Sequence, residues 1–420
     1  MNPSLYRSAM EGKVDVLRQH IHVIKSEVTK NHNTVLHVAA QFGHLQYVVG
    51  VLEACPSLLH RANTKGDTPL HMAAREGQAE IVEALIFRAK TLEQESISSW
   101  GGAVKRMLRA TNVDKDTALH MATRNCHLEE VKYLEVVKLL TKEDPQFQHS
   151  PNNAEETPLY LAAERGNKGV MFALLETCTW LAYSGPEGRT TLHVAALKDS
   201  TGESTKKLLE WKKDLINQMD VYGWTALHYA ACNGSEKGVK ELLAVDRSGV
   251  YITSKTECTI VSRRGVSSES SFPNDGLGTP LHIAAAYGHI SVIEALLSYS
   301  PDCWEVVDGN GQNVLHIAVD MNMESVIKFL VNQSWVRHLI NQKDNQGNTP
   351  LHLLIASDCK VDELWKHRSA DRHAFNGKNM TPVDLVWSDF KGARMSTFAA
   401  TYIMVTTSAF SHCINISISL

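Results

Sequence analysis

The sequence predicts an all-α solenoid, in which short helix-turn-helix units stack side by side. Three observations support this prediction. The stretch T-P-L-H-M-A-A-R-E-G, residues 68–77, returns in variant form along almost the whole chain. The copies follow one another at a nearly constant spacing. Each copy also carries its own signals for starting and ending a helix, so the unit is defined locally.

The residues of this stretch each favour a short helix. Thr68 is a good N-cap, because its hydroxyl can accept from a free N–H of the first turn. Pro69 occupies the first helical position, where a missing N–H costs nothing. Leu70 and the Ala-Ala pair share one face, and the small alanines let a second helix lie close. Gly77 suits the left-handed conformation that ends a helix, and an apolar second helix follows it.

Copies of the stretch recur in register. Steps from Thr34 to Thr68, Thr157 to Thr190 and Asn313 to Thr349 are 34, 33 and 36 residues. A period near ~33 with T-P-L-H-x-A is typical of ankyrin repeats. We therefore expect an ankyrin-repeat solenoid over residues 1–390, with about ten to eleven repeats and short β-hairpin tips. The copies after a degenerate first one at Pro3 begin at Thr34, Thr68, Thr117, Thr157, Thr190, Thr225, Thr279, Asn313, Thr349 and, degenerate again, Thr381.

Several segments depart from the regular period. Residues 88–112 and 246–277 are predicted to be long loops, because they are overlong, polar and rich in Ser and Gly. In the repeat from Thr117, the extra residues preserve the phase of the apolar face, so we expect a longer second helix rather than a break. In the first repeat we expect helices over 4–10 and 14–24.

Composition excludes several classes of protein. The chain of 420 residues is 43% hydrophobic and 21% charged, with a formal net charge of −4, which is ordinary for a soluble folded protein and gives no basic surface for nucleic acid. Its eight cysteines are scattered without a C-x-x-C pair, so neither a zinc site nor a redox motif is indicated. We expect no cofactor and no metal. Singly buried, reduced thiols and the lack of a signal-peptide core favour the cytoplasm.

Histidines repeat too regularly to form one catalytic site. Eight of the twenty occupy the H of T-x-L-H, where an imidazole can bridge the Thr hydroxyl and the backbone of a neighbouring repeat. Because enzyme sites are singular, we interpret these histidines as structural. Phosphate-loop, G-x-S-x-G and H-E-x-x-H motifs do not occur, and Cys359, His367 and His373 match no zinc spacing. An enzyme would need a pocket outside the repeat framework, near residues 246–277.

The variable positions of each repeat are the candidate partner-binding residues. They are the tip residues before each Thr and the two residues after each Ala-Ala, which line the concave face of such a solenoid. Tyr222 and Trp224 are candidate aromatic anchors, although Trp224 could instead pack on the adjacent hairpin. The full set is Phe42, Lys65, Asp67, Arg75, Glu76, Glu164, Arg165, Arg189, Tyr222, Trp224, Asn233 and Tyr287.

Two further features lie outside the regular repeats. Ser267 follows Arg263 and Arg264 in a serine-rich segment, which makes it a phosphorylation candidate, although R-x-x-S matches also arise by chance. Residues 391–420 form an apolar tail rich in Thr and Ser. The tail has fewer than the ~20 predominantly apolar residues that a membrane span needs. It can be a remnant of a membrane domain, a span, or an associating tail.

A narrower resemblance follows from particular stretches. E-G-R-T-T-L-H-V-A-A, Y-G-W-T-A-L-H-Y-A-A, L-L-E-W-K-K-D-L-I and S-Y-S-P-D-C-W-E-V-V-D-G-N-G resemble the plant ankyrin–transmembrane proteins of the accelerated-cell-death group. That resemblance implies a cytosolic ankyrin arm tied to a membrane and acting in defence or stress signalling. The chain lacks the Pro-Gly-Gly motif that names the group's membrane domain.

Together these features predict a non-enzymatic scaffold or adaptor that binds other proteins through its concave surface, in plant defence or stress signalling. The alternative is a membrane-associated regulator of a channel or receptor complex, anchored through a C-terminal transmembrane region. In both cases we expect a cytoplasmic location, at the cytosolic face of the plasma membrane in the second, and no nucleic-acid partner.

Overall fold

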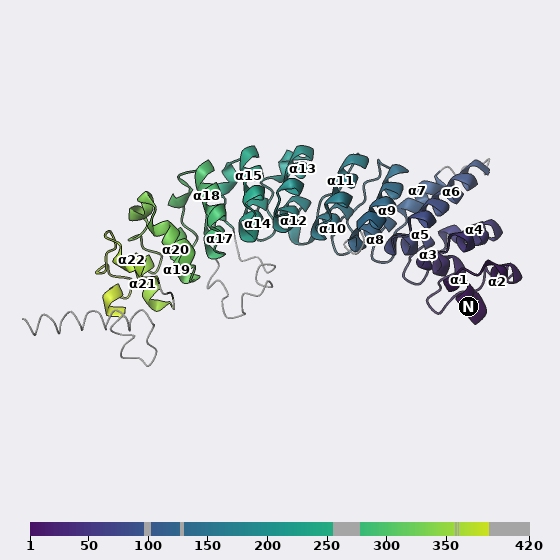
Figure 1. Ribbon diagram of the computed structural model, residues 1–420, viewed down its shortest axis with the longest axis horizontal. Coiled ribbons are helices and arrows are strands. Elements are labelled where there is room, and N and C mark those ends of the chain that lie inside the picture. Colours follow the sequence, from purple (N-terminus) through teal and green to yellow (C-terminus); the bar gives the residue numbers. More distant parts are fainter. Residues whose placement is uncertain (96–101, 127–129, 255–277, 358, 360, 386–420) are drawn as a thin grey trace, which may run out of the picture. The chain divides into compact units, whose positions relative to one another are not determined.

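The computed structural model describes residues 1–95, 102–126, 130–254, 278–357, 359 and 361–385. Contacts group the chain into two compact units, Met1–Lys198 and Asp199–Leu420. Each unit is a row of antiparallel helix pairs (Figure 1). In the described residues of both units the secondary structure is helical, apart from an isolated β-bridge between Ser184 and Thr190. The predicted helical repeat fold is confirmed.

In the first unit, first helices pack on first helices and second helices on second helices. The first helices are α1 (Pro3–Glu11), α3 (Val35–Phe42), α5 (Pro69–Arg75), α8 (Ala118–Asn125), α10 (Pro158–Glu164) and α12 (Thr191–Lys198). The second helices are α2 (Val14–Gln19), α4 (Leu45–Ala54), α6 (Ala79–Glu95), α9 (Glu130–Lys142) and α11 (Lys168–Thr177). A further helix, α7 (Ala103–Arg109), packs on α6.

The second unit repeats this arrangement. Its first helices are α14 (Ala226–Asn233), α17 (Pro280–Ala286), α19 (Val314–Asp320) and α21 (Pro350–Ala356). Its second helices are α13 (Glu203–Trp211), α15 (Glu236–Val245), α18 (Ile290–Tyr299), α20 (Glu324–Val331) and α22 (Asp362–Lys366). Short 3-10 turns follow several second helices of the chain, at η1 (Pro56–His60), η3 (Lys213–Leu215), η4 (Ser248–Tyr251), η5 (Cys303–Glu305) and η6 (Ser334–His338), and η2 (Pro186–Gly188) lies in a tip.

The core lies between the two rows of helices in each unit. Leu70, Ala73 and Ala74 are fully buried, as their shared helical face predicts. Gly77 has φ of +69° at the end of α5, the left-handed conformation expected there. Apolar side chains of the second helices complete each layer, so every repeat buries its apolar face against its neighbours.

Three local predictions need correction. Residues 88–112 are not one long loop, because α6 continues to Glu95 and α7 occupies 103–109. The apolar side chains Val104, Met107 and Leu108 of α7 are buried, which explains why this insertion is helical. The second helix of the first repeat ends at Gln19 rather than residue 24. The tips are tight turns, without a strand ladder in the described residues.

Other local predictions are confirmed. Helix α9 runs unbroken for 13 residues, against 10 in α4 and α11, so the second helix of the Thr117 repeat is longer as expected.

In the degenerate last repeat, Asp384 replaces the histidine, and its carboxylate accepts from the N–H and the hydroxyl of Thr381. The segment 255–277, the tail 391–420 and Ser267 lie outside the described residues.

Candidate functional site

Each tip is organised by one side chain at its first position. The Asn63 side-chain oxygen accepts from the N–H groups of Lys65 and Asp67, at 2.9 and 3.0 Å. A left-handed residue, Gly66 in this tip, then reverses the chain. Asx turns of the same kind form at Asn112, Asn152, Asp220, Asp308, Asp344 and Asn376. The tip residues are therefore held rigidly before any partner binds.

The amides of the tip asparagines connect successive repeats. The Asn112 amide donates to the Asp67 carboxylate at 3.0 Å, and the Asn152 amide donates to the Asp116 carboxylate at 2.8 Å. Asn63 donates in the same way to Asn33, and Asn376 to Asn348. We name these contacts the amide ladder. Sequence reasoning missed it, although an Asn stands five residues before the capping Thr in the repeats of Thr68, Thr117, Thr157 and Thr381.

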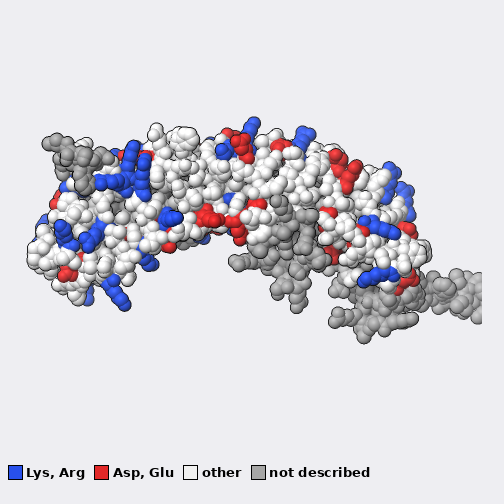
Figure 2. Space-filling view, turned by 180° about the vertical axis from the view of Figure 1, so that it is seen from behind, with Lys and Arg blue, Asp and Glu red and all other residues white. Residues whose placement is uncertain are grey.

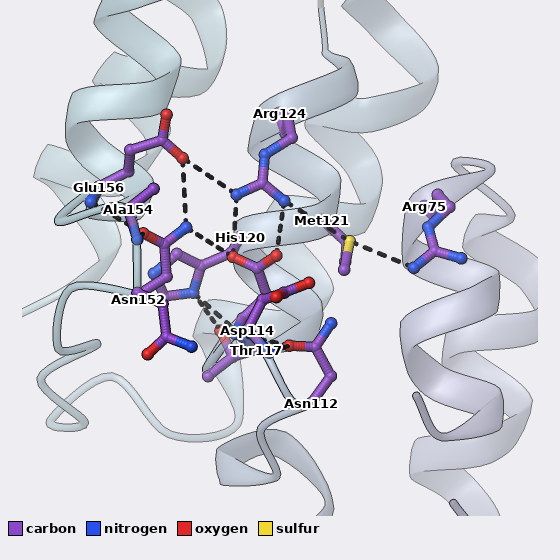
Figure 3. A network of polar contacts seen from close by, with 12 residues as sticks. Arg75, Asn112, Asp114, Thr117, His120, Met121, Arg124, Asn152, Ala154 and Glu156 are labelled. Atoms are coloured by element: carbon purple, nitrogen blue, oxygen red, sulfur yellow. Dashed lines mark hydrogen bonds and ion pairs between the residues drawn. The ribbon is translucent and has the colours of Figure 1, made fainter. Parts of the chain in front are cut away.

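Arginines after the Ala-Ala pair are held by the same tips. Arg124 contacts both carboxylate oxygens of Asp116, at 2.6 and 2.9 Å, and Glu156 at 3.1 Å (Figure 3). Arg75 contacts Asp67 at 2.8 Å. Both arginine side chains are less than a third exposed. Hydrogen bonds to Arg124 and Asn152 hold the pKa of Asp116 below its usual value, against the effect of burial.

Five of the repeated histidines form the bridge between repeats that the sequence predicts, whereas Nε2 of His120 and Nε2 of His282 are buried without a hydrogen-bond partner among the described residues. His71 Nδ1 lies 2.8 Å from the Thr68 hydroxyl, and Nε2 lies 3.0 Å from the Asp116 carbonyl oxygen of the next repeat. Because a carbonyl oxygen only accepts, Nε2 carries the proton. Nδ1 accepts from the Thr68 N–H at 3.2 Å and therefore carries none, so the imidazole is neutral. Burial lowers the pKa of His37 to about 4 and that of His316 to about 4. Equivalent inter-repeat bonds are made by His37, His228, His316 and His352.

One repeat replaces this histidine with Tyr160. The ring is buried and lies against Gly185, where an added Cβ would approach the Tyr160 Cε2 atom to 2.0 Å. Gly185 is therefore required at the tip position that other repeats fill with Asn or Asp. The Thr157 hydroxyl donates instead to the Ser184 carbonyl at 2.9 Å. Neither Tyr160 nor Gly185 was singled out from the sequence, because the two lie in different repeats.

The candidate partner-binding residues differ in how much of their side chains is exposed. Phe42 is 43% exposed, and Lys65 and Arg165 are also exposed. Asp67 is buried under Arg75 and Asn112, and Arg189 is 9% exposed, so the expectation that these two present free side chains is wrong. The remaining predicted residues are partly buried, namely Arg75, Glu76, Glu164, Tyr222, Asn233 and Tyr287.

Trp224 also corrects the sequence prediction. It is 4% exposed, and its ring lies 5.3 Å from that of Tyr229 and 5.8 Å from that of His228, within its own repeat. An accessible Trp224 anchor is therefore excluded. The exposed apolar side chain of this tip is Val221, at 61%.

Metal-ligating side chains do not cluster in the described residues. No group of three or more His, Cys, Asp or Glu there could hold a metal ion. The six described cysteines are free, and burial raises the pKa of Cys303 to about 12.

A hollow of about 620 Å³ lies at the helix ends, lined by residues that include Gly43, Gly77, Val131 and Lys132. None of the described helices is both long and apolar enough to cross a membrane.

These repeats form a surface of rigidly presented side chains, which defines a class of helical repeat protein that binds other proteins. The model of the family "Ankyrin repeats (3 copies)" matches residues 5–98, 96–184, 132–218, 175–256, 265–336 and 281–373. The chain belongs to the ankyrin-repeat family, as predicted, and its repeats are protein-interaction modules.

Several individual proteins are also similar to this chain. The chain is similar to Protein ACCELERATED CELL DEATH 6 of Arabidopsis thaliana, with 27% identity over 84% of this chain and 51% of that protein. It is also similar to human SH3 and multiple ankyrin repeat domains protein 2, with 27% identity over 70% of this chain and 14% of that protein. The crystal structure of the human ASB11 ankyrin repeat domain matches with a TM-score of 0.43 and 22% identity, over 59% of this chain and 98% of that one. The chain thus spans about half the length of the plant relative.

Proposed function

We propose that this protein is a non-enzymatic scaffold in plant defence or stress signalling, which binds partner proteins through the tips and the solvent side of its first helices. We call this the tip surface, and we assign it to the repeats within residues 1–390. The observation that supports it most strongly is the rigid support of its side chains. Arg124, for example, is held by two carboxylates before any partner arrives. Preorganised side chains lose less conformational entropy on binding.

The proposed role in plant defence or stress signalling rests on similarity to one relative. ACCELERATED CELL DEATH 6 of Arabidopsis thaliana carries a cell-death function in its name, and its similarity covers most of this chain. We place the protein in the cytoplasm, at the cytosolic face of the plasma membrane where a membrane partner or the tail holds it. Fractionation of plant cells tests this location, and recovery entirely in the soluble fraction would exclude a membrane-anchored regulator.

Affinity capture with paired variants tests the binding surface. Phe42, on the tip surface, and Phe87, on the second helix α6, are both exposed aromatic residues, at 43% and 70%. Phe42→Ala should reduce the recovery of partners captured by the full chain, whereas Phe87→Ala should not. Equal recovery with both variants would count against the tip surface. Failure of the wild-type protein to enrich any partner over a tag-only control would count against the scaffold function itself.

A further inference from the structure

The exposed side chains of the inserted helix α7 are all charged. Val104, Met107 and Leu108 are buried, and α7 packs on α6. Lys105 and Arg106 are exposed. A helix that lies on a membrane inserts its apolar side into the lipid, whereas α7 already uses its apolar side inside the fold. The outer surface of α7 therefore offers a ligand charge alone.

Two ion pairs hold α7 and α6 beside the C-terminal end of α9. The Arg109 guanidinium contacts the two carboxylate oxygens of Asp144, at 2.6 and 3.1 Å. The Lys90 ammonium lies 2.8 Å from the Glu143 carboxylate. Because Glu143 and Asp144 directly follow α9, the ends of the three helices lie together. The two pairs also neutralise the carboxylates at this end of α9.

Further lysines lie on this end of α9. Lys138 and Lys142 are one turn apart, and both are exposed. We name these two lysines, with Lys105 and Arg106 of α7, the basic face. Lys105, Lys138 and Lys142 make no ion pair with any residue that the structure describes.

Charges of opposite sign are separated on this part of the molecule. Residues 103–109 and 136–142 contain five Lys or Arg and no Asp or Glu, in a chain with a formal net charge of −4. Figure 2 shows Lys and Arg side chains gathered at the upper left, over the part of the first unit that contains α6, α7 and α9, and Asp and Glu side chains gathered at the lower edge. An acidic ligand is therefore attracted to the outer helices and repelled from the lower edge.

We propose that the basic face binds an acidic segment of a partner protein. The basic face lies on α7 and α9 rather than on the tip surface, so it is a second binding surface of the scaffold. Lysine carries a point charge on a flexible stem, which attracts carboxylates without requiring one geometry. This property suits an extended segment rich in Asp and Glu. The two ion pairs keep the helices that carry these cations in fixed positions, so less order has to be gained on binding.

A defined acidic peptide tests the basic face directly. The probe is a fluorescein-labelled peptide of repeating Gly-Ser-Glu, and its anisotropy is measured with the full chain at low salt. The triple variant Lys105→Gln, Lys138→Gln, Lys142→Gln should weaken binding roughly tenfold, because each lost charge should weaken it about twofold. A Gly-Ser-Gln peptide should not bind, because it carries no carboxylate side chains.

A matched control separates the basic face from general attraction by charge. The triple variant Lys25→Gln, Lys206→Gln, Lys237→Gln removes the same net charge from exposed lysines elsewhere and should weaken binding by less than about twofold. Equal losses in the two triple variants would overturn the proposal, because binding would then follow the net charge alone. Phe42→Ala should leave peptide binding unchanged, so a failure of the tip surface can be told apart from a failure of the basic face.

Two further measurements test other ligands of the basic face. The full chain should pellet no more with vesicles of phosphatidylserine and phosphatidylcholine than the Lys105, Lys138 and Lys142 triple variant does. Pelleting that requires these lysines would assign the basic face to a lipid surface and overturn the proposal. Sedimentation velocity at low salt should give the same oligomeric state for both proteins. Self-association that the triple variant loses would assign the face to a second copy of the chain instead.

Discussion

Two junctions between neighbouring repeats are held together by different contacts. At the junction after Thr68, His71 bonds to the Asp116 carbonyl and the Asn112 amide bonds to Asp67. At the junction after Thr157, neither bond exists, because Tyr160 replaces the histidine and Gly185 replaces the asparagine. The first junction is held by directional hydrogen bonds, and the second is held by a ring packed against a backbone.

This difference changes the kind of contact on which each junction depends. In the junction after Thr68, hydrogen bonds use both nitrogens of the His71 imidazole. The tyrosine junction depends instead on the fit of the Tyr160 ring against Gly185. A side chain at that glycine would meet the ring, so this junction constrains the residue of the next repeat by shape.

Acid should lower the stability of the fold through its buried histidines. His37, His120, His282 and His316 each have a pKa lowered by burial to about 4, while unfolded histidine titrates near ~6.5. The unfolded chain then binds more protons between these values, so stability is complete above about pH 6.5 and falls as the pH decreases. We expect a loss on the order of 5 kcal/mol between pH 7 and pH 5. Denaturant unfolding monitored by circular dichroism measures it, and a constant midpoint over this range would contradict the neutral-imidazole interpretation.

Gly185→Ala should disrupt the tyrosine junction. Gly185 has extended backbone angles, φ −143° and ψ −178°, so alanine meets no backbone strain, but its Cβ would lie 2.0 Å from the Tyr160 ring. We expect a loss of about 4 kcal/mol in unfolding free energy.

Gly166→Ala is the control for Gly185→Ala. Gly166 has φ of +69°, with no atom within 4 Å of an added Cβ. It should cost only about 1 kcal/mol, from backbone strain alone. Equal effects at the two glycines would show that the ring contact does not constrain Gly185.

Removing a histidine bridge should have a slightly smaller effect. His71→Ala leaves the Asp116 carbonyl and the Thr68 N–H without their partner and opens a cavity in a fully buried position. We expect a loss of about 3 kcal/mol, measured by urea unfolding. His22→Ala, at an exposed position, should change stability by less than about 0.5 kcal/mol. A loss at His71 as small as at His22 would mean that the bridge contributes little.

Tyr160→Phe should have the smallest effect on stability. The phenylalanine ring keeps the packing against Gly185, and the lost hydroxyl makes no hydrogen bond within the described chain. We expect a change within about 0.5 kcal/mol in the same unfolding experiment. A loss above about 1 kcal/mol would show that the hydroxyl has a structural role.

Local residues were enough to predict much of the architecture. Thr68, Pro69 and Gly77 mark the start and end of a helix through their own backbone preferences, and the structure places those boundaries as expected. The insertion at 88–112 was misinterpreted, because its polar and glycine residues surround a stretch whose apolar side chains find a helix to pack against.

The sequence by itself determined the repeat class, the helix order and the structural role of the histidines, because these depend on signals within a few residues. Only the tertiary structure decided which tip residues reach solvent. Asp67 is buried by Asn112, 45 residues away, and Tyr160 faces Gly185 of the next repeat. Exposure of a side chain depends on the neighbours that stacking brings to it, and a repeat pattern specifies the stacking without specifying each neighbour.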